Sequence, residues 1–259
     1  MRADQLLVER GLATSRSQAQ RLIESGVEWQ VADGWRRVAK NGEDLPAHAP
    51  LRLLDDAEAR YVSRGGLKLE GALRHTGLQV AGLRCLDVGQ STGGFTDCLL
   101  QAGAMRVVGL DVGQGQLNAT LRADARVRCV EQVNARDAQA VAAELESECE
   151  GPDGGFDLLV GDLSFISQTL VLPAVLPWVR PGGDVLMLVK PQFELQPGQV
   201  GKGGIVREPA LHALVEQKIR ESHASLGLAV HDWFASTITG GDGNREFFIW
   251  ARKPVERQA

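Results

Sequence analysis

The sequence predicts an α/β protein with a doubly wound, mostly parallel sheet of seven strands, preceded by a small α+β domain. Strand-like and helical patterns alternate from about residue 61 onward, as in parallel sheets whose strands are joined by helices. A glycine-rich turn directly follows the first of these strands, and a separate pattern of two helices and short strands occupies residues 1–60. We therefore expect a domain of residues 1–60, which includes a short linker, and a domain of residues 61–259.

The first domain begins with two short helical patterns between Asp4 and Ile23. Gly11 separates them, and Thr14 or Ser15 is placed to cap the second helix, which Gly26 ends. Residues 55–60 are polar and aperiodic, as expected of a linker. Alternating apolar residues around an Asp-Gly turn predict short strands: Val27, Trp29, Val31, Val38, Leu51 and Leu53.

Three arginines, Arg10, Arg16 and Arg21, lie on or beside these helices and could face RNA phosphates. A solvated surface of mixed charge is the alternative, because the net charge of -5 and the pI near 5.6 do not indicate a nucleic-acid partner. The order of residues from about 2 to 54 resembles the alpha-L RNA-binding module first described in a ribosomal protein. The resemblance implies contact with structured RNA, although the hairpin turn at residues 31–35 departs from the module's usual sequence.

The second domain begins with a helix that ends near Thr76 and Gly77. Its last two strand patterns, residues 229–235 and 246–251, lack an intervening helix and should pair as an antiparallel ribbon at one side of the sheet. Residues 195–204 show no periodicity and predict a mobile loop over the cleft or a plain surface loop. The remaining expected strands are residues 84–88, 105–111, 127–130, 156–161 and 184–189, and the clearest helices are residues 138–148 and 208–226.

The turn after the first of these strands predicts a nucleotide-type cofactor site. Gly89, Gly93 and Gly94 let the backbone approach a ligand, but their spacing is not the G-x-G-x-x-G of dinucleotide sites. Asp87 just before the turn disfavours a pyrophosphate and suits a cofactor with an ammonium group and a carboxylate, such as S-adenosylmethionine. Asp111, after the next strand, is placed to take ribose hydroxyls. A glycine-rich turn of another α/β protein remains the alternative.

Charged residues follow the strands at the edge where open parallel sheets bind ligands. Asp162 and Lys190 end two strands, and Glu246 starts the final antiparallel strand at the same edge. Lys68, from the preceding helix, can reach the same place. Each residue alone is typical of a surface charge, but together they predict a catalytic cluster.

Seven motifs spread over nearly the whole chain resemble the TlyA (haemolysin A) family, at residues 64–68, 87–97, 111–117, 134–136, 162–167, 190–194 and 243–247. That family joins the RNA-binding module to an FtsJ-like, class I methyltransferase domain with a Rossmann-like sheet. The resemblance implies S-adenosylmethionine-dependent 2'-O-ribose methylation of a cytidine in ribosomal RNA, and large-subunit RNA is favoured because the chain resembles the shorter members.

The resemblance also implies the roles of individual residues. Gln114 and Gln132 depart from the family, which often has Tyr and Arg there, and leave the contacts at the adenosine edge open. The implied catalytic tetrad is Lys68, Asp162, Lys190 and Glu246, and the implied cofactor residues are Asp87, Gly89, Ser91, Thr92, Gly93, Gly94, Asp111 and Asn134. The residues that we expect to bind RNA are Arg10, Arg16, Arg21 and Arg64.

The chemistry requires a ribose hydroxyl to be aligned and deprotonated. We expect Lys190 to hydrogen-bond the hydroxyl while Asp162 and Glu246 orient the lysines, with the coupled groups titrating together. A flipped base would need stacking partners, for which Phe165 and Phe193 are candidates, although both could equally be packing residues.

Two other functions are possible: a non-catalytic RNA-binding protein with a vestigial methyltransferase fold, and, more remotely, a membrane-acting cytolysin. The composition, 44% hydrophobic and 24% charged, is typical of a soluble globular protein. We expect a cytoplasmic protein, because the sequence lacks an apolar spanning segment and a signal-peptide pattern.

The four cysteines are scattered along the sequence, so we expect no metal site and no disulfide. They are Cys85, Cys98, Cys129 and Cys149.

Overall fold

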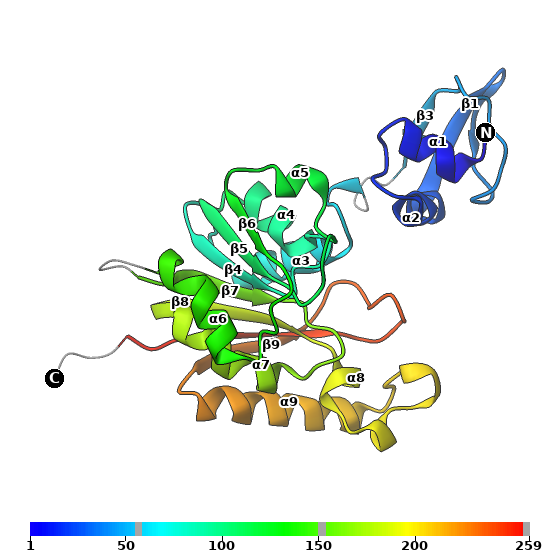
Figure 1. The fold of residues 1–259 in the computed structure, drawn as a ribbon. Helices are drawn as coiled ribbons and strands as arrows, with labels where there is room; N and C mark the ends of the chain where they lie inside the picture. The colour runs from blue at the N-terminus through cyan, green and yellow to red at the C-terminus, as the bar shows by residue number, and fades with distance from the viewer. Residues whose placement is uncertain (55–58, 150–153, 256–259) are drawn as a thin grey trace. The chain divides into compact units, whose positions relative to one another are not determined.

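A computed structural model describes residues 1–54, 59–149 and 154–255 (Figure 1). The chain divides into two compact units, Met1–Leu67 and Lys68–Ala259, here called the small and the large unit. Most of the expected linker falls on residues 55–58, which lie outside the described residues. Each unit is described by itself.

The small unit contains two helices and a three-stranded antiparallel sheet, as the sequence predicts. Gly11, with φ 71°, turns the chain between the helices, and the Ser15 hydroxyl accepts a hydrogen bond from the Gln18 N–H to cap the second. Val38, expected in a strand, lies one residue beyond the second strand and is buried. The elements are α1 (Ala3–Glu9), α2 (Arg16–Gly26), β1 (Val27–Val31), β2 (Gly34–Arg37) and β3 (Leu51–Leu53), with strand order β2-β1-β3.

The large unit contains one seven-stranded sheet with the order β6-β5-β4-β7-β8-β10-β9. Its first five strands are parallel, and β10 is antiparallel to both β8 and β9, so the predicted terminal ribbon is confirmed. The strands are β4 (Arg84–Val88), β5 (Arg106–Leu110), β6 (Val127–Val130), β7 (Phe156–Gly161), β8 (Val179–Val189), β9 (Ala229–Ala235) and β10 (Phe247–Arg252).

Helices cover both faces of this sheet, with α6, α7 and α9 on one face and α3, α4 and α5 on the other (Figure 1). Residues 195–204, which the sequence predicts as an irregular loop, contain the 3-10 turns η4 (Pro197–Gln199) and η5 (Lys202–Gly204). The helices are α3 (Gly65–Thr76), α4 (Gly94–Gln101), α5 (Ala119–Arg122), α6 (Ala138–Leu145), α7 (Gln168–Val175), α8 (Pro191–Glu194) and α9 (Pro209–Ser225), with further 3-10 turns η2 (Glu146–Glu148) and η3 (Leu176–Trp178).

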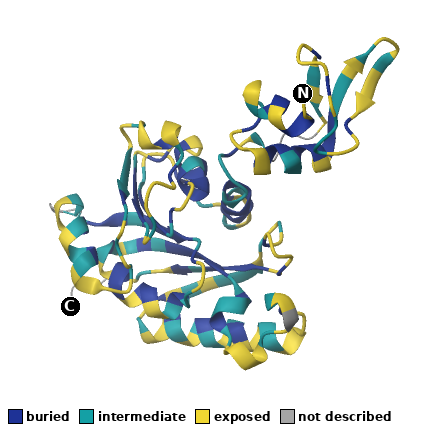
Figure 2. Ribbon diagram, turned by 45° about the vertical axis from the view of Figure 1, so that its right-hand side comes forward, coloured by how far each residue is buried: buried dark blue, intermediate teal, exposed yellow. Residues whose placement is uncertain are grey.

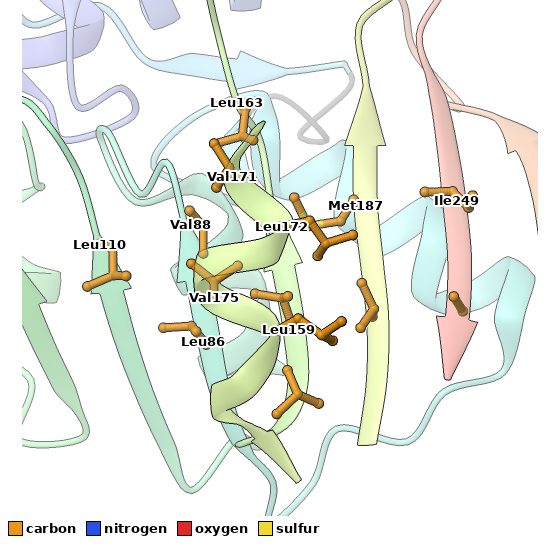
Figure 3. Close-up of a cluster of buried hydrophobic side chains, with 14 of the residues drawn as sticks. Leu86, Val88, Leu110, Leu159, Leu163, Val171, Leu172, Val175, Met187 and Ile249 are labelled. Atoms are coloured by element: carbon orange, nitrogen blue, oxygen red, sulfur yellow. The ribbon is translucent and has the colours of Figure 1, made fainter. Parts of the chain in front are cut away.

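One hydrophobic core of the large unit lies between the sheet and helices α6, α7 and α9. Leu172 and Val175 of α7 pack over Leu86 and Leu159 of the central strands (Figure 3). The central strands are buried along most of their length (Figure 2), which explains why they appear in the sequence as continuous apolar runs. A rigid sheet of this kind fixes the ends of β4, β5, β7, β8 and β10, where the candidate site is found.

Candidate active site

The four residues of the predicted tetrad lie at one edge of the sheet. Asp162 follows β7 directly, and Lys190 follows β8 and caps the short helix α8. Strand β10 runs antiparallel to β8 with Phe247 opposite Val189, which places Glu246 at the beginning of β10 next to the end of β8. Lys68 reaches this edge from the first turn of α3. The topology therefore brings together residues that are up to 178 positions apart, from Lys68 to Glu246.

The tetrad forms two ion pairs. The Lys190 Nζ atom lies 2.6 Å from Asp162 Oδ1, and the Lys68 Nζ atom lies 2.7 Å from Glu246 Oε2. The Lys68–Glu246 pair is the more deeply buried, with side-chain exposures of 9% and 2%, against 11% for Lys190 and 22% for Asp162. Burial raises the pKa of Glu246 above its ordinary value, and the charge of Lys68 opposes that shift. The Lys190–Asp162 pair is therefore the more accessible of the two, chiefly through Asp162.

Ser164 is a member of this cluster that the sequence analysis missed. The Lys190 Nζ atom donates a hydrogen bond of 2.8 Å to the Ser164 hydroxyl, in addition to its ion pair with Asp162. Ser164 lies in the motif of residues 162–167, two residues after Asp162, but no role was assigned to it there. Two acceptors from one loop thus fix the direction of the Lys190 side chain.

A cavity of about 590 Å³ lies beside this cluster. Asp162 lines the cavity and belongs to the tetrad, so the two sites meet at this residue. Of the predicted cofactor residues, Gly89, Ser91, Asp111 and Asn134 line the cavity, whereas Asp87, Thr92, Gly93 and Gly94 are not among its lining residues. The volume lies in the range typical of small-molecule sites, about 300–1,000 Å³.

In the wall of the cavity, two backbone segments approach closely at Gly89, and Asp111 presents a carboxylate. Gly89 has φ 83°, and a Cβ atom there would lie 2.9 Å from the Asp162 carbonyl oxygen. Asp111 accepts one backbone hydrogen bond on each carboxylate oxygen, from Ser91 and from Gly113, both at 2.7 Å. Each oxygen retains a second acceptor position, as hydroxyl recognition requires.

The predicted cofactor residues that do not line the cavity support the glycine-rich turn after β4. Asp87 is fully buried, and its Oδ2 atom accepts a 2.7 Å hydrogen bond from the Thr96 hydroxyl. Burial raises the pKa of Asp87 to about 7. Gly93 has φ 95°, and a Cβ atom there would lie 2.4 Å from Leu121. The Thr92 carbonyl accepts from Asn118, and Gly94 begins α4.

The sequence of the chain matches two known families. The FtsJ-like methyltransferase family covers residues 61–253, and the S4 domain covers residues 1–26. The TlyA protein of Mycobacterium tuberculosis, named as a 16S/23S rRNA (cytidine-2'-O)-methyltransferase, is 43% identical over 99% of this chain and 91% of its own length. The chain belongs to the TlyA (haemolysin A) family of FtsJ-like methyltransferases. The predicted family is thereby confirmed.

Two further relatives agree with this membership. A Brachyspira hyodysenteriae protein named Hemolysin A is 36% identical over 95% of this chain and 98% of its own length. The solved structure of a Streptococcus thermophilus protein that bears the name hemolysin has a TM-score of 0.72 and 41% identity, and it covers 98% of this chain and 88% of that one. The similarity therefore extends over both units of the chain and is not confined to the methyltransferase domain.

The aromatic pair that the sequence analysis singled out stands at the mouth of the cavity of this TlyA-family chain. Phe165 lines the cavity, is 90% exposed and has φ 64°, a backbone conformation that is costly for a residue other than glycine. Its ring centroid lies 5.0 Å from that of Phe193 at an interplanar angle of 47°.

Two positions depart from the family. Gln114 is not among the residues that line the cavity, and Gln132 has φ 62° and donates its backbone N–H to the Gly113 carbonyl.

The arginines predicted to bind RNA are partly engaged within the small unit. Arg16 lies 2.9 Å from the fully buried Asp4, and Arg2 forms a second pair with that carboxylate, so that the pKa of Asp4 lies far below its ordinary range. Arg10 donates to the Ala47 carbonyl at 2.6 Å, and Arg21 and Arg64 also have partners. Arg10 and Arg16 remain exposed, so each has a side open to a ligand.

In the described part of the TlyA-family chain, no three or more His, Cys, Asp or Glu side chains are grouped so that they could hold a metal ion. Within the same residues, no helix has the length and apolar character needed to cross a bilayer.

Proposed function

We propose that this protein transfers a methyl group from S-adenosylmethionine to the 2'-hydroxyl of a cytidine in ribosomal RNA. The observation that carries the proposal is the Lys190–Asp162 pair at the rim of a nucleoside-sized cavity that Asp162 also lines. The names of the M. tuberculosis relative and of a Campylobacter jejuni relative support the substrate class. The latter is named as a 23S rRNA (cytidine-2'-O)-methyltransferase and is 30% identical over 81% of this chain.

The cavity residues suit this cofactor. The carboxylate of Asp111 is available to the ribose hydroxyls, and Gly89 gives the ligand close access to the backbone. Ser91 and Asn134 add polar groups to the wall, while Asp87, Thr92, Gly93 and Gly94 hold the turn in shape. When bound, S-adenosylmethionine supplies a methyl group that its positively charged sulfur already activates.

The tetrad aligns the ribose hydroxyl and removes its proton. Lys190 has three donor positions, and Asp162 and Ser164 occupy two of them, which directs the third toward a substrate. Lys190 takes up the hydroxyl proton as it gives one of its own protons to the Asp162 carboxylate, so the pair gains one proton while the ribose oxygen becomes nucleophilic. Lys68 and Glu246 form a buried ion pair with no net charge, so they do not change the net charge around Lys190 and Asp162.

We further propose that the small unit binds the RNA through Arg10, Arg16 and Arg21, with Arg64 at its end, and that the favoured substrate is large-subunit RNA. Most contacts of this kind are made to the RNA backbone and recognise shape rather than sequence. A surface on which arginines are held by acids and by backbone carbonyls can present them to phosphates in a defined arrangement.

The test is to incubate separated ribosomal subunits with the protein and radiolabelled S-adenosylmethionine, and then to map the label by nuclease protection. We expect 2'-O-methylcytidine in the large subunit. Label confined to the small subunit would overturn the substrate choice but not the activity. Absence of label, together with no heat in a calorimetric titration with the cofactor, would support the vestigial fold instead.

The names of the haemolysin relatives suggest a competing function, which has its own test. Purified protein should not lyse erythrocytes. Lysis that is equally strong in a Lys190→Ala variant would favour a membrane-acting protein over a methyltransferase.

A further inference from the structure

A second cavity of the large unit, of about 310 Å³, is lined by Arg207, Arg245, His212 and Gly243. Arg245 directly precedes Glu246 of the tetrad, and the two side chains differ in environment: Glu246 is buried and Arg245 is exposed. Arg207 comes from the segment that leads into α9. The cavity thus lies beside the segment that contains Glu246, but none of its lining residues also lines the cofactor cavity.

The charge in this cavity is unusual for the chain. Most other arginines of the large unit are held by acids, for example Arg128 by Glu144, Arg180 by Asp157 and Arg252 by Asp184. In the part of the chain that the structure describes, the Arg136 side chain, in the wall of the cofactor cavity, shares the lack of such a partner. Within the described residues, Arg207 and Arg245 form no hydrogen bond or ion pair, and Arg245 only lies over the Phe247 ring at 5.8 Å. None of the residues that line the cavity is acidic.

The backbone that carries both arginines is braced by one buried side chain. Asn244, which is 1% exposed, accepts a 2.8 Å hydrogen bond from the Val206 N–H and donates one of 2.9 Å to the Gly204 carbonyl. These bonds tie the segment before Arg207 to the segment that contains Arg245. The backbone on either side of the cavity is therefore held in place, which lowers the part of the entropic cost of binding that comes from ordering these segments.

We propose that the cavity of Arg207 and Arg245 binds a backbone phosphate of the substrate RNA close to the nucleotide that is methylated. Guanidinium groups match the geometry of phosphate oxygens, and two uncompensated positive charges in a chain of net charge -5 favour an anion at this place. A phosphate contact next to Glu246 would fix the register of the RNA at the tetrad. This inference rests on the proposed function, because it takes RNA as the substrate.

The test compares the double variant Arg207→Ala/Arg245→Ala with the wild-type protein. We expect the KM for large ribosomal subunits to rise about tenfold or more at physiological salt, with kcat and cofactor affinity within about twofold. The slope of log(kcat/KM) against log[salt] should become shallower by about one for each lost phosphate contact. The matched control is Arg74→Ala/Arg220→Ala, which removes the same charge from exposed helix pairs with Glu70 and Glu216.

A binding assay keeps this inference separate from the proposed activity. The affinity for a short fluorescent oligocytidylate is measured by anisotropy over a salt series, without any methyl transfer. A loss of affinity and of salt dependence in the cavity variant, but not in the control, supports the phosphate site even if the wild-type protein methylates no RNA. Equal curves for the cavity variant and the wild type, or equal losses in the control, would overturn it.

Discussion

The Nζ atom of Lys68 lies 2.7 Å from Oε2 of Glu246, and 9% and 2% of these two side chains are exposed. Removing one member of a buried ion pair leaves the other charge without compensation, which costs about 3–5 kcal/mol. Replacing both members with apolar residues of similar size is far less costly. This asymmetry allows the structural and catalytic roles of the pair to be separated.

We therefore expect Glu246→Ala to lower the free energy of unfolding by about 3–5 kcal/mol and to abolish methyl transfer. The double variant Lys68→Met/Glu246→Leu should recover most of the stability in urea unfolding but none of the activity. A double variant that is stable and fully active would show that the pair has no part in catalysis.

Lys190→Ala should leave the affinity for S-adenosylmethionine intact, because Lys190 does not line the cofactor cavity. It should cost less stability than Glu246→Ala, because the Asp162 carboxylate that is left unpaired is 22% exposed. The loss of Lys190 should reduce kcat by about 10²–10⁴-fold, the usual contribution of a positioned acid or base. Single-turnover kinetics with saturating RNA and a calorimetric titration with the cofactor measure the effects on rate and affinity. Near-normal turnover would remove Lys190 from its assigned role.

Asp87 should make the stability of the protein depend on pH. Its pKa in the folded state is about 7, because the side chain is fully buried, whereas an unfolded aspartate has its ordinary value of 3.8. The folded state therefore holds a proton that the unfolded state releases. The contribution of Asp87 to the free energy of unfolding is complete below pH 3.8, the pKa in the unfolded state. It falls by about 1.4 kcal/mol per pH unit as the pH rises from there, until the folded-state pKa of about 7 is passed.

Asp87→Asn cannot ionise, so the free energy of unfolding of this variant should fall less as the pH rises over that range. The free energy of unfolding of the variant minus that of the wild type should increase up to about pH 7 and stay constant above it. Urea unfolding at a series of pH values measures both curves. Parallel curves would mean that Asp87 does not carry the proton.

Much of this site could be predicted from the sequence, because the ends of parallel strands meet at one edge and the antiparallel β10 returns Glu246 to it. The position of Asp87 behind the turn follows from strand alternation, since Leu86 and Val88 on either side belong to the core of the opposite face. The partner of Arg16 could not be predicted, because the Asp4 carboxylate comes from another helix. The Lys190–Ser164 hydrogen bond likewise depends on tertiary packing.

Phe165 should act as a stacking surface for an RNA base. Its ring is 90% exposed, so Phe165→Ala should change the free energy of unfolding by less than about 0.5 kcal/mol. Loss of one base–aromatic contact, about 1–3 kcal/mol, should reduce kcat/KM for RNA by about 5- to 150-fold. Phe165→Trp should retain activity because it keeps an aromatic face. Equal activity of the Ala and Trp variants would show that the ring only packs against Phe193.

Glu194 should position Lys190 although it is not part of the tetrad. Its carboxylate is 3% exposed, accepts a 2.9 Å hydrogen bond from the Gln168 N–H, and also accepts from the Ser167 hydroxyl. These bonds join the end of the loop that begins with Asp162 to helix α8, which starts immediately after Lys190. A displacement of about 1 Å at a reacting group can cost about 10²-fold in rate, so the link matters for kcat.

We expect Glu194→Ala to lower kcat by about 10- to 100-fold with little change in the KM for the cofactor, because Glu194 does not line the cofactor cavity. Glu194→Gln keeps an acceptor for the Gln168 N–H and should recover part of the rate. The control is Lys218→Met, which removes the 3.1 Å ion pair with Glu194 together with the hydrogen bonds of Lys218 to the Glu194 carbonyl and the Ser167 hydroxyl. It leaves both hydrogen bonds that the Glu194 carboxylate accepts from the loop, and it should retain near-normal kcat. If the Lys218 variant loses as much activity as Glu194→Ala, the charge pair and not the link between the loops positions Lys190.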